Sequence, residues 1–310
     1  MEKVTVLKGG DSPERDVSLV SGAAIAAGLR AKGFAVAELD PSDYAGFGGL
    51  AQKLHEEGTD VVFIGLHGGA GENGALQAGL ELAGFRHTGS DHKACALTMD
   101  KFVSKLLALE EGIPAADYIL MRDDLINDYK DPADYQGVVD KLGLPLIVKP
   151  NDAGSSVGIT LVEDISGLKA AVKLALRYSG SALLEKFIPG RELTATVLDG
   201  VALPLVEIKP RSGWYDYQNK YNEGRSDYLA PAPVEESVSQ LIQLFAERLW
   251  QVFGLSGYAR IDFRYDGAKP YFLEVNTLPG MTPLSLTPMA AKTVGLSFPD
   301  LVEMIVRLAR

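Results

Sequence analysis

The residues best suited to chemistry lie in two stretches near the C-terminus. Arg260 and Asp262 alternate with apolar residues in the first stretch. Glu274 and Asn276 do the same in the second. Because successive side chains of a strand point to opposite faces, the members of each pair share a face. Carboxylate and amide oxygens are the hard ligands that Mg²⁺ prefers. The pattern is typical of a magnesium site, although a solvated strand face with incidental charges would show it too.

An Asp-Gly turn signal separates these two stretches and predicts a β-hairpin. A hairpin centred near Ala268 would place Asp262 opposite Glu274. The same register puts Arg260 opposite Asn276. Two directly opposed carboxylates cost free energy unless a cation lies between them, so this register favours a bound divalent cation.

A glycine- and serine-rich segment, 149–158, lies between two stretches that we expect to be strands. A Walker A loop must open a helix, so this segment is not one. It can still fold over phosphates, offering backbone N–H groups and hydroxyls, with Lys149 at the strand end within reach. The alternative is a tight turn without a ligand.

The segment 184–192 joins an apolar strand to a sharp turn and carries Glu185 and Lys186. It has the form of a hinge between domains, whose backbone groups can pair with the edge of an adenine. An ordinary strand end with exposed charges is the alternative.

Gly9-Gly10 follow the first predicted strand and precede a helix, which is where open α/β sheets bind ligands. The segment lacks the GxGxxG pattern of dinucleotide-binding proteins. Asp11 and Glu14 are spaced as in a capping box, which is a purely structural alternative for both.

For three single residues a purely structural interpretation is available. His67 follows a buried strand and precedes glycines, so it either faces a site or is hydrogen-bonded at a domain edge. Lys101 lies on a predicted helix, where lysine is usually solvated. Cys95 on the same helix is expected to be a small core residue.

The elements that must position these residues alternate between strand and helix in the first third of the chain. This alternation predicts a βαβ arrangement and a parallel sheet. Further along, the fold becomes α+β in part. The expected strands include 4–7, 34–39, 60–66, 144–149, 158–162, 182–187, 193–198 and 203–208, and the expected helices include 17–32, 50–57, 75–83, 94–111, 168–178, 237–253 and 298–309. Residues 209–231 lack periodicity but are rich in tyrosine, which favours an ordered lid.

Composition excludes several classes of protein. The chain has 310 residues, enough for two or three domains, and 30 basic against 41 acidic residues give a net charge of −11. Such a polyanion is a poor partner for nucleic acid or a membrane surface. One cysteine excludes an intrachain disulfide. No apolar run is long enough to span a bilayer, and no signal peptide is recognised, so we expect a soluble cytoplasmic protein.

Taken together, the segments resemble the D-alanine–D-alanine ligase family of the ATP-grasp superfamily, from Val4 to the C-terminus. Eight motifs come in the family's order. They are Gly-Gly-x-Ser-x-Glu-Arg-x-Val-Ser at 9–18, Leu-His-Gly at 66–68, Met-Asp-Lys at 99–101, Val-Lys-Pro at 148–150, Gly-Ser-Ser-Val-Gly at 154–158, Tyr-Asp-Tyr-x-x-Lys-Tyr at 215–221, Gly-Tyr-Ala-Arg-Ile-Asp at 257–262 and Leu-Glu-Val-Asn-Thr-x-Pro-Gly-Met-Thr at 273–282. Departures from the usual pattern are few, at Lys8, Asn73 and Ala153.

The resemblance implies a three-domain ATP-grasp architecture of the α/β class, α+β in part. It comprises a Rossmann-like N-terminal domain with a parallel sheet (1–89), a central domain with the glycine-rich loop (90–184) and a C-terminal domain with the tyrosine-rich lid and the metal site (185–310). It also implies ATP bound between the last two domains, two Mg²⁺ (or Mn²⁺) ions, and ligation of two D-alanines through a D-alanyl phosphate. A homodimer and the absence of nucleic-acid and membrane partners belong to the same expectation.

The roles implied by the resemblance fall into four groups. The catalytic group is Glu14, Ser155, Tyr221, Arg260 and Gly280. The ATP-binding group is Lys101, Lys149, Ser156, Glu185, Lys186, Phe187, Ile188, Glu192 and Lys220. The metal ligands are Asp262, Glu274 and Asn276. The substrate-binding group is Glu14, His67, Ser285 and Leu286.

The acceptor and the activity have alternatives. In the resembled family, tyrosine at position 221 goes with D-alanine as acceptor and phenylalanine with D-lactate. Other ATP-grasp ligases use D-lactate, D-serine or another amino acid. A nucleotide-binding protein without catalysis is a further alternative, disfavoured by the complete metal and arginine set. A dehydrogenase is disfavoured by the missing dinucleotide pattern.

Overall fold

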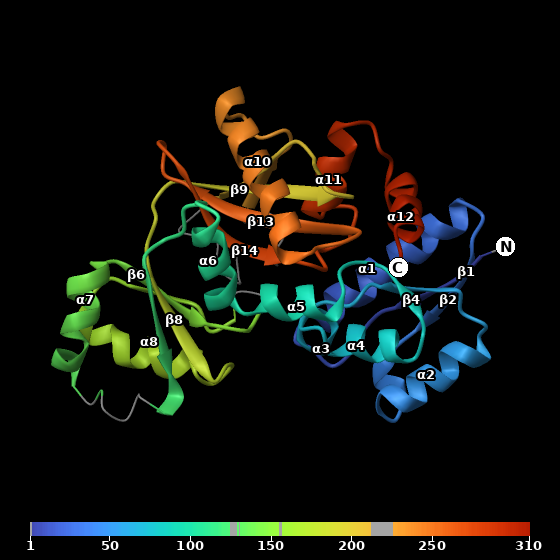
Figure 1. The fold of residues 1–310 in the computed structure, drawn as a ribbon, viewed down its shortest axis with the longest axis horizontal. Coiled ribbons are helices and arrows are strands. Elements are labelled where there is room, and N and C mark those ends of the chain that lie inside the picture. The colour runs from blue at the N-terminus through green and yellow to red at the C-terminus, as the bar shows by residue number, and fades with distance from the viewer. Residues whose placement is uncertain (1, 125–128, 130, 155–156, 212–225) are drawn as a thin grey trace.

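The structure is a computed structural model that describes residues 2–124, 129, 131–154, 157–211 and 226–310. Its described residues form three sheets. The first sheet, formed by strands between residues 3 and 87 and called the N-terminal sheet below, lies at one end of the molecule. The second sheet, formed between residues 118 and 186, lies at the other end. The third sheet, formed between residues 191 and 276, lies between and above them (Figure 1). The predicted mixture of a parallel sheet with α+β parts is confirmed.

The N-terminal sheet is parallel, with strand order β2-β1-β3-β4. Its strands are β1 (Lys3–Leu7), β2 (Ala35–Leu39), β3 (Val61–Ile64) and β4 (Arg86–His87), and its helices are α1 (Arg15–Ala31), α2 (Gly46–Glu56), α3 (Gly69–Glu72) and α4 (Ala75–Leu82). β3 is wholly apolar, and Val4, Val6 and Leu7 of β1 are buried, because both faces of the sheet are covered. Val61 and Phe63 pack towards α1, whereas Val62 and Ile64 pack towards α2 and α4.

The second sheet is antiparallel, with order β5-β8-β6-β7. Its strands are β5 (Tyr118–Arg122), β6 (Leu146–Pro150), β7 (Thr160–Val162) and β8 (Ser181–Lys186), and its helices are α7 (Gln136–Leu142) and α8 (Leu168–Ala175). The glycine-rich segment joins β6 to β7, as predicted, so it is a hairpin connection.

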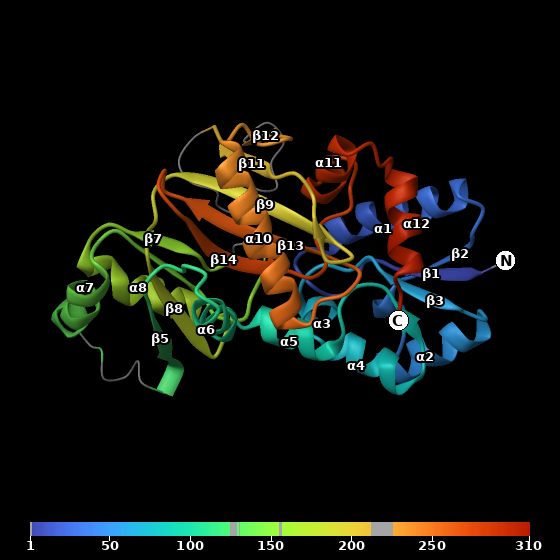
Figure 2. The same ribbon diagram turned by 45° about the horizontal axis from the view of Figure 1, so that its top comes forward.

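The third sheet has order β12-β11-β9-β13-β14, with β10 paired to β9. Its strands are β9 (Arg191–Leu198), β10 (Val201–Ala202), β11 (Val206–Pro210), β12 (Ser226–Leu229), β13 (Tyr258–Tyr265) and β14 (Pro270–Asn276). Figure 2 shows α10 (Glu236–Phe253) lying across this sheet. The predicted hairpin register is confirmed, since Asp262 pairs with Glu274 and Arg260 with Asn276.

The C-terminal end of the chain packs against the N-terminal sheet. The last helices are α11 (Leu286–Thr293) and α12 (Phe298–Arg307), and short 3₁₀ turns lie at Pro41–Asp43, Pro132–Tyr135 and Ile165–Gly167. Leu301 and Ile305 of α12 share a core with Ile25 and Leu29 of α1. The backbones of His87 and Arg310 exchange two hydrogen bonds, which ties the C-terminus to β4.

The sequence-based expectations for several elements were wrong. The single helix expected at 94–111 is two helices, α5 (His92–Met99) and α6 (Lys101–Glu110). They divide at Asp100, whose backbone is extended. The Asp100 side chain caps α6 by accepting a hydrogen bond from the Val103 N–H. α11 was missed in a stretch expected to be a loop. β12 was missed because its strand character comes only from pairing with β11.

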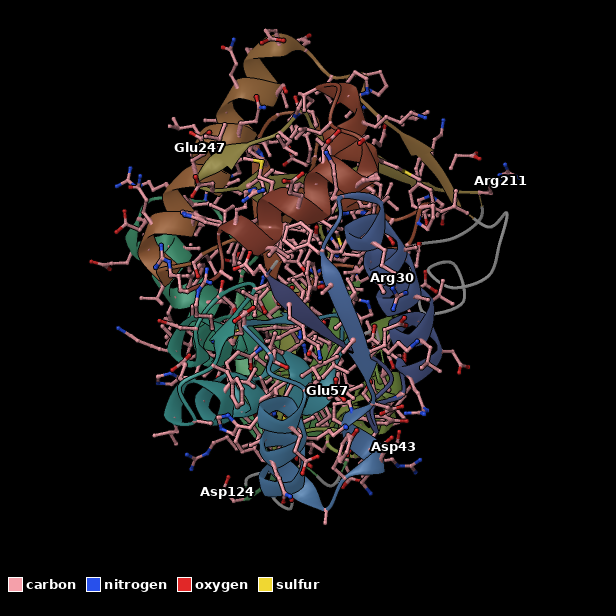
Figure 3. All side chains as sticks on the ribbon, turned by 90° about the vertical axis from the view of Figure 1, so that its right-hand side faces the viewer. Arg30, Asp43, Glu57, Asp124, Arg211 and Glu247 are labelled. Carbon is pink, nitrogen blue, oxygen red and sulfur yellow. The ribbon has the colours of Figure 1, made fainter. Side chains whose placement is uncertain are left out.

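The domain boundaries stay a proposal. Each proposed domain holds one of the three sheets, but the division at 184/185 falls inside β8, and α5 and α6 contact β14 of the third sheet. Six charged residues from different parts of the chain are partly or fully exposed, and Figure 3 labels them: Arg30, Asp43, Glu57, Asp124, Arg211 and Glu247. In the part of the chain that the structure describes, no helix combines the length and apolarity needed to cross a membrane.

Candidate active site

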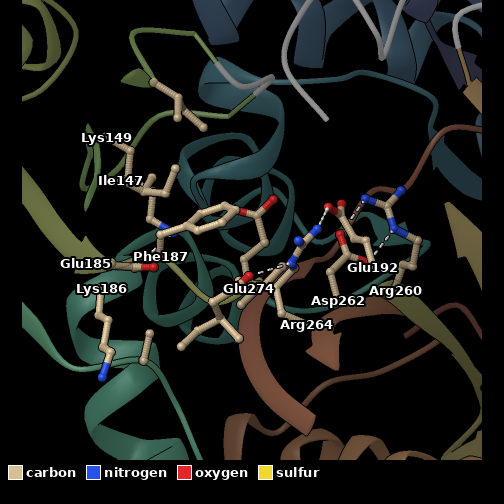
Figure 4. A pocket seen from close by; sticks show the side chains of 14 residues that line it. Ile147, Lys149, Glu185, Lys186, Phe187, Glu192, Arg260, Asp262, Arg264 and Glu274 are labelled. Carbon is tan, nitrogen blue, oxygen red and sulfur yellow. Dashed lines mark hydrogen bonds and ion pairs between the residues drawn. The ribbon is translucent and has the colours of Figure 1, made fainter. Parts of the chain in front are cut away.

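A hollow lies between the second and third sheets (Figure 4). Its walls are β6, the segment after β8, and the β13–β14 hairpin. The lining residues include Lys149, Glu185, Lys186, Phe187, Ile188, Glu192, Arg260, Asp262, Arg264 and Glu274. The hairpin and the hinge segment, which are far apart in sequence, therefore face one another across one pocket.

A buried carboxylate on β8 forms ion pairs with two lysines at one end of this pocket. The Glu185 Oε1 atom lies 2.9 Å from the Lys149 Nζ and 3.2 Å from the Lys105 Nζ. Although burial opposes ionisation of Glu185, the two ammonium groups hold the pKa of this carboxyl below its ordinary value. Glu185 therefore positions Lys149 at the pocket wall, and its alternative interpretation as an exposed strand-end charge is wrong.

Lys101 begins α6 and is buried, so its interpretation as a solvated helix lysine is wrong. Its Nζ donates to the Ala153 carbonyl at 2.6 Å and lies 3.8 Å from Glu274 Oε2. Asn151 holds the same region together, because its amide accepts from the Phe102 N–H and donates to Asp100. The start of the glycine-rich segment is thus tied to the helix that carries Lys101.

The β13–β14 hairpin brings the predicted metal ligands onto neighbouring strands. Asp262 pairs in register with Glu274, and Arg260 donates twice to Asp262, at 2.9 Å and 2.8 Å. The Asn276 Oδ1 atom is buried, and among the described residues it has no hydrogen-bond partner. A buried oxygen without a hydrogen-bond donor costs free energy unless a ligand such as a cation binds it. Two carboxylates and this amide oxygen are a fitting donor set for Mg²⁺. No compact group of three His, Cys, Asp or Glu side chains exists among the described residues, so the amide is essential to this set.

The hinge segment after β8 is held by Arg264. Its guanidinium pairs with Glu192 at 3.2 Å and lies 5.9 Å from the centre of the Phe187 ring. Burial raises the pKa of Glu192 to about 7; Arg264 opposes this shift, while Asp262 and Glu274 add to it.

A second hollow adjoins the first and is lined by Glu14, Glu72, Thr98, Met99, Lys101, Gly154, Glu274, Val275, Asn276 and Thr277. Glu14 precedes α1 but makes no cap with it, so the capping-box interpretation is wrong. A Cβ built on Gly154 would lie 3.7 Å from carboxylate oxygens of both Glu14 and Glu72. The glycine-rich segment therefore approaches two carboxylates of the part of the chain that forms the N-terminal sheet.

His67 joins the N-terminal sheet to the loop after β14. Its Nε2 lies 3.0 Å from Ser21 Oγ and its Nδ1 3.0 Å from the Leu278 carbonyl. Glu72 lies 3.9 Å from the same Nδ1. His67 is therefore hydrogen-bonded where two parts of the chain meet, as in the structural alternative given above. It also lies beside the second hollow, because Glu72 lines that hollow.

The remaining predicted site residues lie beyond β14. Ser285 precedes α11, and its hydroxyl lies 2.8 Å from Thr282 Oγ1. A Cβ on Gly280 would come within 2.9 Å of Ser285 Oγ, so only glycine fits there without a shift. Leu286 is buried as the first residue of α11.

The structure brings most predicted residues into these two hollows or the loop beside them. Four of them, Ser155, Ser156, Lys220 and Tyr221, lie outside the described residues.

Sequence reasoning gave no role to Lys105, Arg264 and Glu72. Lys105 follows Lys101 by four residues and so shares its helix face. Arg264 continues the alternation of Arg260 and Asp262 along β13. For Glu72 the one signal is its position after the glycines that follow β3.

Known proteins resemble this chain over its whole length. The family model described as D-ala D-ala ligase C-terminus matches residues 107–307. A D-alanine--D-alanine ligase of Desulforudis audaxviator (strain MP104C) is 41% identical, covering 100% of this chain and 99% of that protein. The same kind of enzyme from Syntrophotalea carbinolica (strain DSM 2380 / NBRC 103641 / GraBd1) is 42% identical, covering 98% and 95%.

Two solved structures are also similar. The D-alanine--D-alanine ligase from Bacillus anthracis complexed with ATP has a TM-score of 0.84 at 30% identity, covering 99% of this chain and 96% of that one. The VanG D-Ala:D-Ser ligase from Enterococcus faecalis has a TM-score of 0.85 at 30% identity, covering 99% of both. Because the family model spans more than half of the sequence and relatives at 41–42% identity span nearly all of it, the chain belongs to the D-alanine–D-alanine ligase family.

Proposed function

We propose that the chain joins two D-alanine molecules to D-alanyl-D-alanine at the expense of ATP, as a step in making a peptidoglycan precursor. The observation that carries this proposal is the position of Glu274, which lines both hollows. The nucleotide pocket and the hollow that contains Glu14 therefore meet at one carboxylate. A ligase that phosphorylates a carboxylate needs this adjacency, because the γ-phosphate must reach the bound amino acid.

ATP occupies the larger hollow in this proposal. The hinge backbone from Glu185 to Ile188 contacts the adenine, and Glu192 contacts the ribose. The ammonium groups of Lys101, Lys149 and Lys220 face the phosphates, and Ser156 adds a contact from the glycine-rich segment. These lysines supply local positive charge in a chain whose net charge is −11. The similarity to a ligase solved in complex with ATP supports the binding of ATP.

The first D-alanine occupies the second hollow, with its ammonium on Glu14 and with Ser155 and Tyr221 as hydrogen-bonding partners. Its carboxylate oxygen attacks the γ-phosphorus, the bond to the β–γ bridging oxygen breaks, and ADP leaves with that electron pair. The amine of the second D-alanine then attacks the acyl carbon. Arg260 and the Gly280 N–H stabilise the resulting oxyanion. Phosphate departs and the amine loses a proton, giving the amide.

Two Mg²⁺ (or Mn²⁺) ions belong to this proposal. Asp262, Glu274 and Asn276 would hold them, supported by the orphaned Asn276 oxygen. Bound Mg²⁺ would neutralise charge on the phosphate oxygens during transfer.

The second D-alanine would bind its carboxylate at Ser285 and the Leu286 N–H. The N-terminal end of α11, an eight-residue helix, favours a negative charge at that position. His67 assists by fixing the adjoining Leu278 loop. D-Serine is the alternative acceptor, favoured by the similarity to the VanG D-Ala:D-Ser ligase. Full-length relatives at 41–42% identity named D-alanine--D-alanine ligase support D-alanine.

The test is product analysis. The purified chain is incubated with ATP, Mg²⁺ and D-alanine, phosphate release is followed, and the product is identified by mass. Phosphate released together with D-alanyl-D-alanine is the expected result. Turnover only when D-serine or D-lactate is added would overturn the acceptor assignment, and no turnover with any acceptor would leave a nucleotide-binding protein.

Assembly and location complete the proposal. We propose a homodimer, carried over from the family resemblance, which light scattering coupled to size exclusion would test. We also propose a cytoplasmic location, where ATP is available, with D-alanine and ATP as the small-molecule substrates.

A further inference from the structure

Arg264 contacts three points along one short segment of chain. Its Nε donates to the Ile188 carbonyl at 3.3 Å, its Nη2 to the Gly190 carbonyl at 2.9 Å, and its Nη1 to Glu192 at 3.2 Å. The Phe187 ring lies 5.9 Å from the guanidinium carbon. One side chain of β13 therefore engages the segment 187–192 almost from end to end.

This segment leads from β8 of the second sheet into β9 of the third, and its residues Phe187, Ile188 and Glu192 line the nucleotide pocket. Carbonyls in such a connection lie outside the sheet ladders and need other donors. Arg264 supplies donors to two of them. The backbone also lies tightly against the same strand, since a Cβ on Gly190 would come within 2.2 Å of the Tyr265 carbonyl.

Arginine suits this position better than any other side chain. Its planar guanidinium offers five donors in a fixed arrangement, so several contacts can be made with little loss of freedom. Lysine offers a single point charge and cannot reproduce the fork. Arg264 lies on the same strand face as Asp262, two residues away, and its pair with Glu192 lies beside the pair of Arg260 with Asp262 (Figure 4).

We propose that Arg264 is a positioning residue for the nucleotide: it holds the hinge backbone and Glu192 in the arrangement that receives the base and ribose of ATP. This inference rests on the proposed nucleotide site and adds a residue to it. Arg264 acts through Ile188, Gly190 and Glu192, away from the reacting atoms. Its removal therefore weakens nucleotide binding and base selection without slowing the chemical step to the same extent.

The structure provides a matched control in Arg191. Its guanidinium also makes three contacts, two to Glu207 at 2.8 Å and 2.7 Å and one to the Pro233 carbonyl at 3.0 Å. Arg191 does not line the pocket. An arginine that only stabilises the fold would behave like Arg191.

The experiment compares R264M, R264K and R191M with the unchanged full-length chain. We expect R264M to raise the KM for ATP and the Kd for ADP about tenfold or more, since it removes contacts made by a charged group. The kcat and the KM for D-alanine should change much less, and preference for ATP over GTP should fall. R264K should recover part of the loss. R191M should lower the melting temperature and leave the KM for ATP unchanged.

An R264M variant whose ADP affinity and ATP/GTP preference match those of the unchanged chain, or of R191M, would overturn the proposal. If R264M does not fold, the decision passes to R264K, whose ADP affinity must then fall relative to the unchanged chain. Calorimetric titration with ADP needs no turnover. A chain that binds ADP but makes no D-alanyl-D-alanine would therefore defeat the proposed function alone, whereas a chain that binds no ADP would defeat both.

Discussion

The Arg260 guanidinium and the Asp262 carboxylate form a two-fold ion pair along one face of β13, with Nε–Oδ1 at 2.9 Å and Nη2–Oδ2 at 2.8 Å. Both side chains are less than one tenth exposed. The proposed oxyanion donor and a proposed metal ligand therefore hold each other in place. Bidentate pairs of this kind fix geometry as well as charge. A change at either residue must disturb the other.

Asp262→Asn should reduce kcat about 100-fold or more, because it removes a metal-binding charge and leaves Arg260 with a neutral partner. Steady-state kinetics at saturating ATP and Mg²⁺ measure the change. Asp266→Asn is the control in the same hairpin: Asp266 accepts from the Ala268 and Lys269 N–H groups in the turn, which asparagine can also do. Equal activity of the two variants would contradict the role given to Asp262.

Asn276→Leu should separate stability from activity. It removes a buried oxygen that has no partner among the described residues, so the free energy of unfolding should stay the same or rise. The Mg²⁺ concentration needed for half-maximal rate should rise about tenfold or more, because a hard ligand is lost. Asn276→Asp, which keeps an oxygen there, should retain its response to Mg²⁺. A clear loss of stability without a change in Mg²⁺ dependence would count against the ligand role.

Lys105→Met should destabilise the fold. Lys105 is fully buried, lies 3.2 Å from Glu185 Oε1 and donates to the Phe272 carbonyl at 3.2 Å. Its loss removes one of the two cations on a buried carboxylate, a cost on the order of 2 kcal/mol with Lys149 still in place. Urea unfolding measures it. Lys269→Met is the control, because Lys269 also lies near an aromatic ring, 5.0 Å from the centre of Tyr271, but is exposed. Equal free energies of unfolding for the two variants would show that Lys105 does not stabilise the fold.

Asp40, which follows β2 of the N-terminal sheet, should make the fold sensitive to acid. Partial burial opposes its ionisation, but Arg15, Ser42 and the Gly10 N–H hold the pKa of this carboxyl well below its usual range. A carboxyl with a lowered folded-state pKa stabilises the fold above its unfolded pKa, about 4, and loses that contribution as the pH falls. The unfolding free energy of Asp40→Asn should therefore fall less between pH 5 and pH 3 than that of the unchanged chain. Parallel pH profiles from urea titrations would contradict this.

Tyr221→Phe should allow D-lactate as an acceptor, as the resemblance to the family implies. Mass analysis of products formed from D-alanine with an excess of D-lactate measures the change. The unchanged chain, assayed alongside, should give only the dipeptide. A Tyr221→Phe enzyme that gains no use of D-lactate would count against carrying this residue's role over from the family.

Local pattern predicted many elements because both faces of the parallel strands and one face of most helices are buried. α1 was expected from its apolar spacing and the following Gly33, which has a φ of 83°. The break at Asp100 was missed, since apolar spacing continues through it and the cap depends on a single side-chain contact. β12 was missed because an edge strand with mixed polarity is defined by its partner.

The sequence by itself determined the family, the βαβ start, and the pairing of Asp262 with Glu274, because motif order, strand periodicity and an Asp-Gly turn are local signals. Only the tertiary structure decided that Glu274 lines two hollows and that Lys105 and Lys149 both pair with Glu185. The same holds for the hydrogen bond from Arg264 to the Gly190 carbonyl in the hinge segment. Arg264 and Gly190 are 74 positions apart in the chain, and Glu14 and Glu274, which share a hollow, are still further apart. Side-chain periodicity carries no information about which distant segment will pack against a given face. Burial and hydrogen bonding across the three sheets settle those partners.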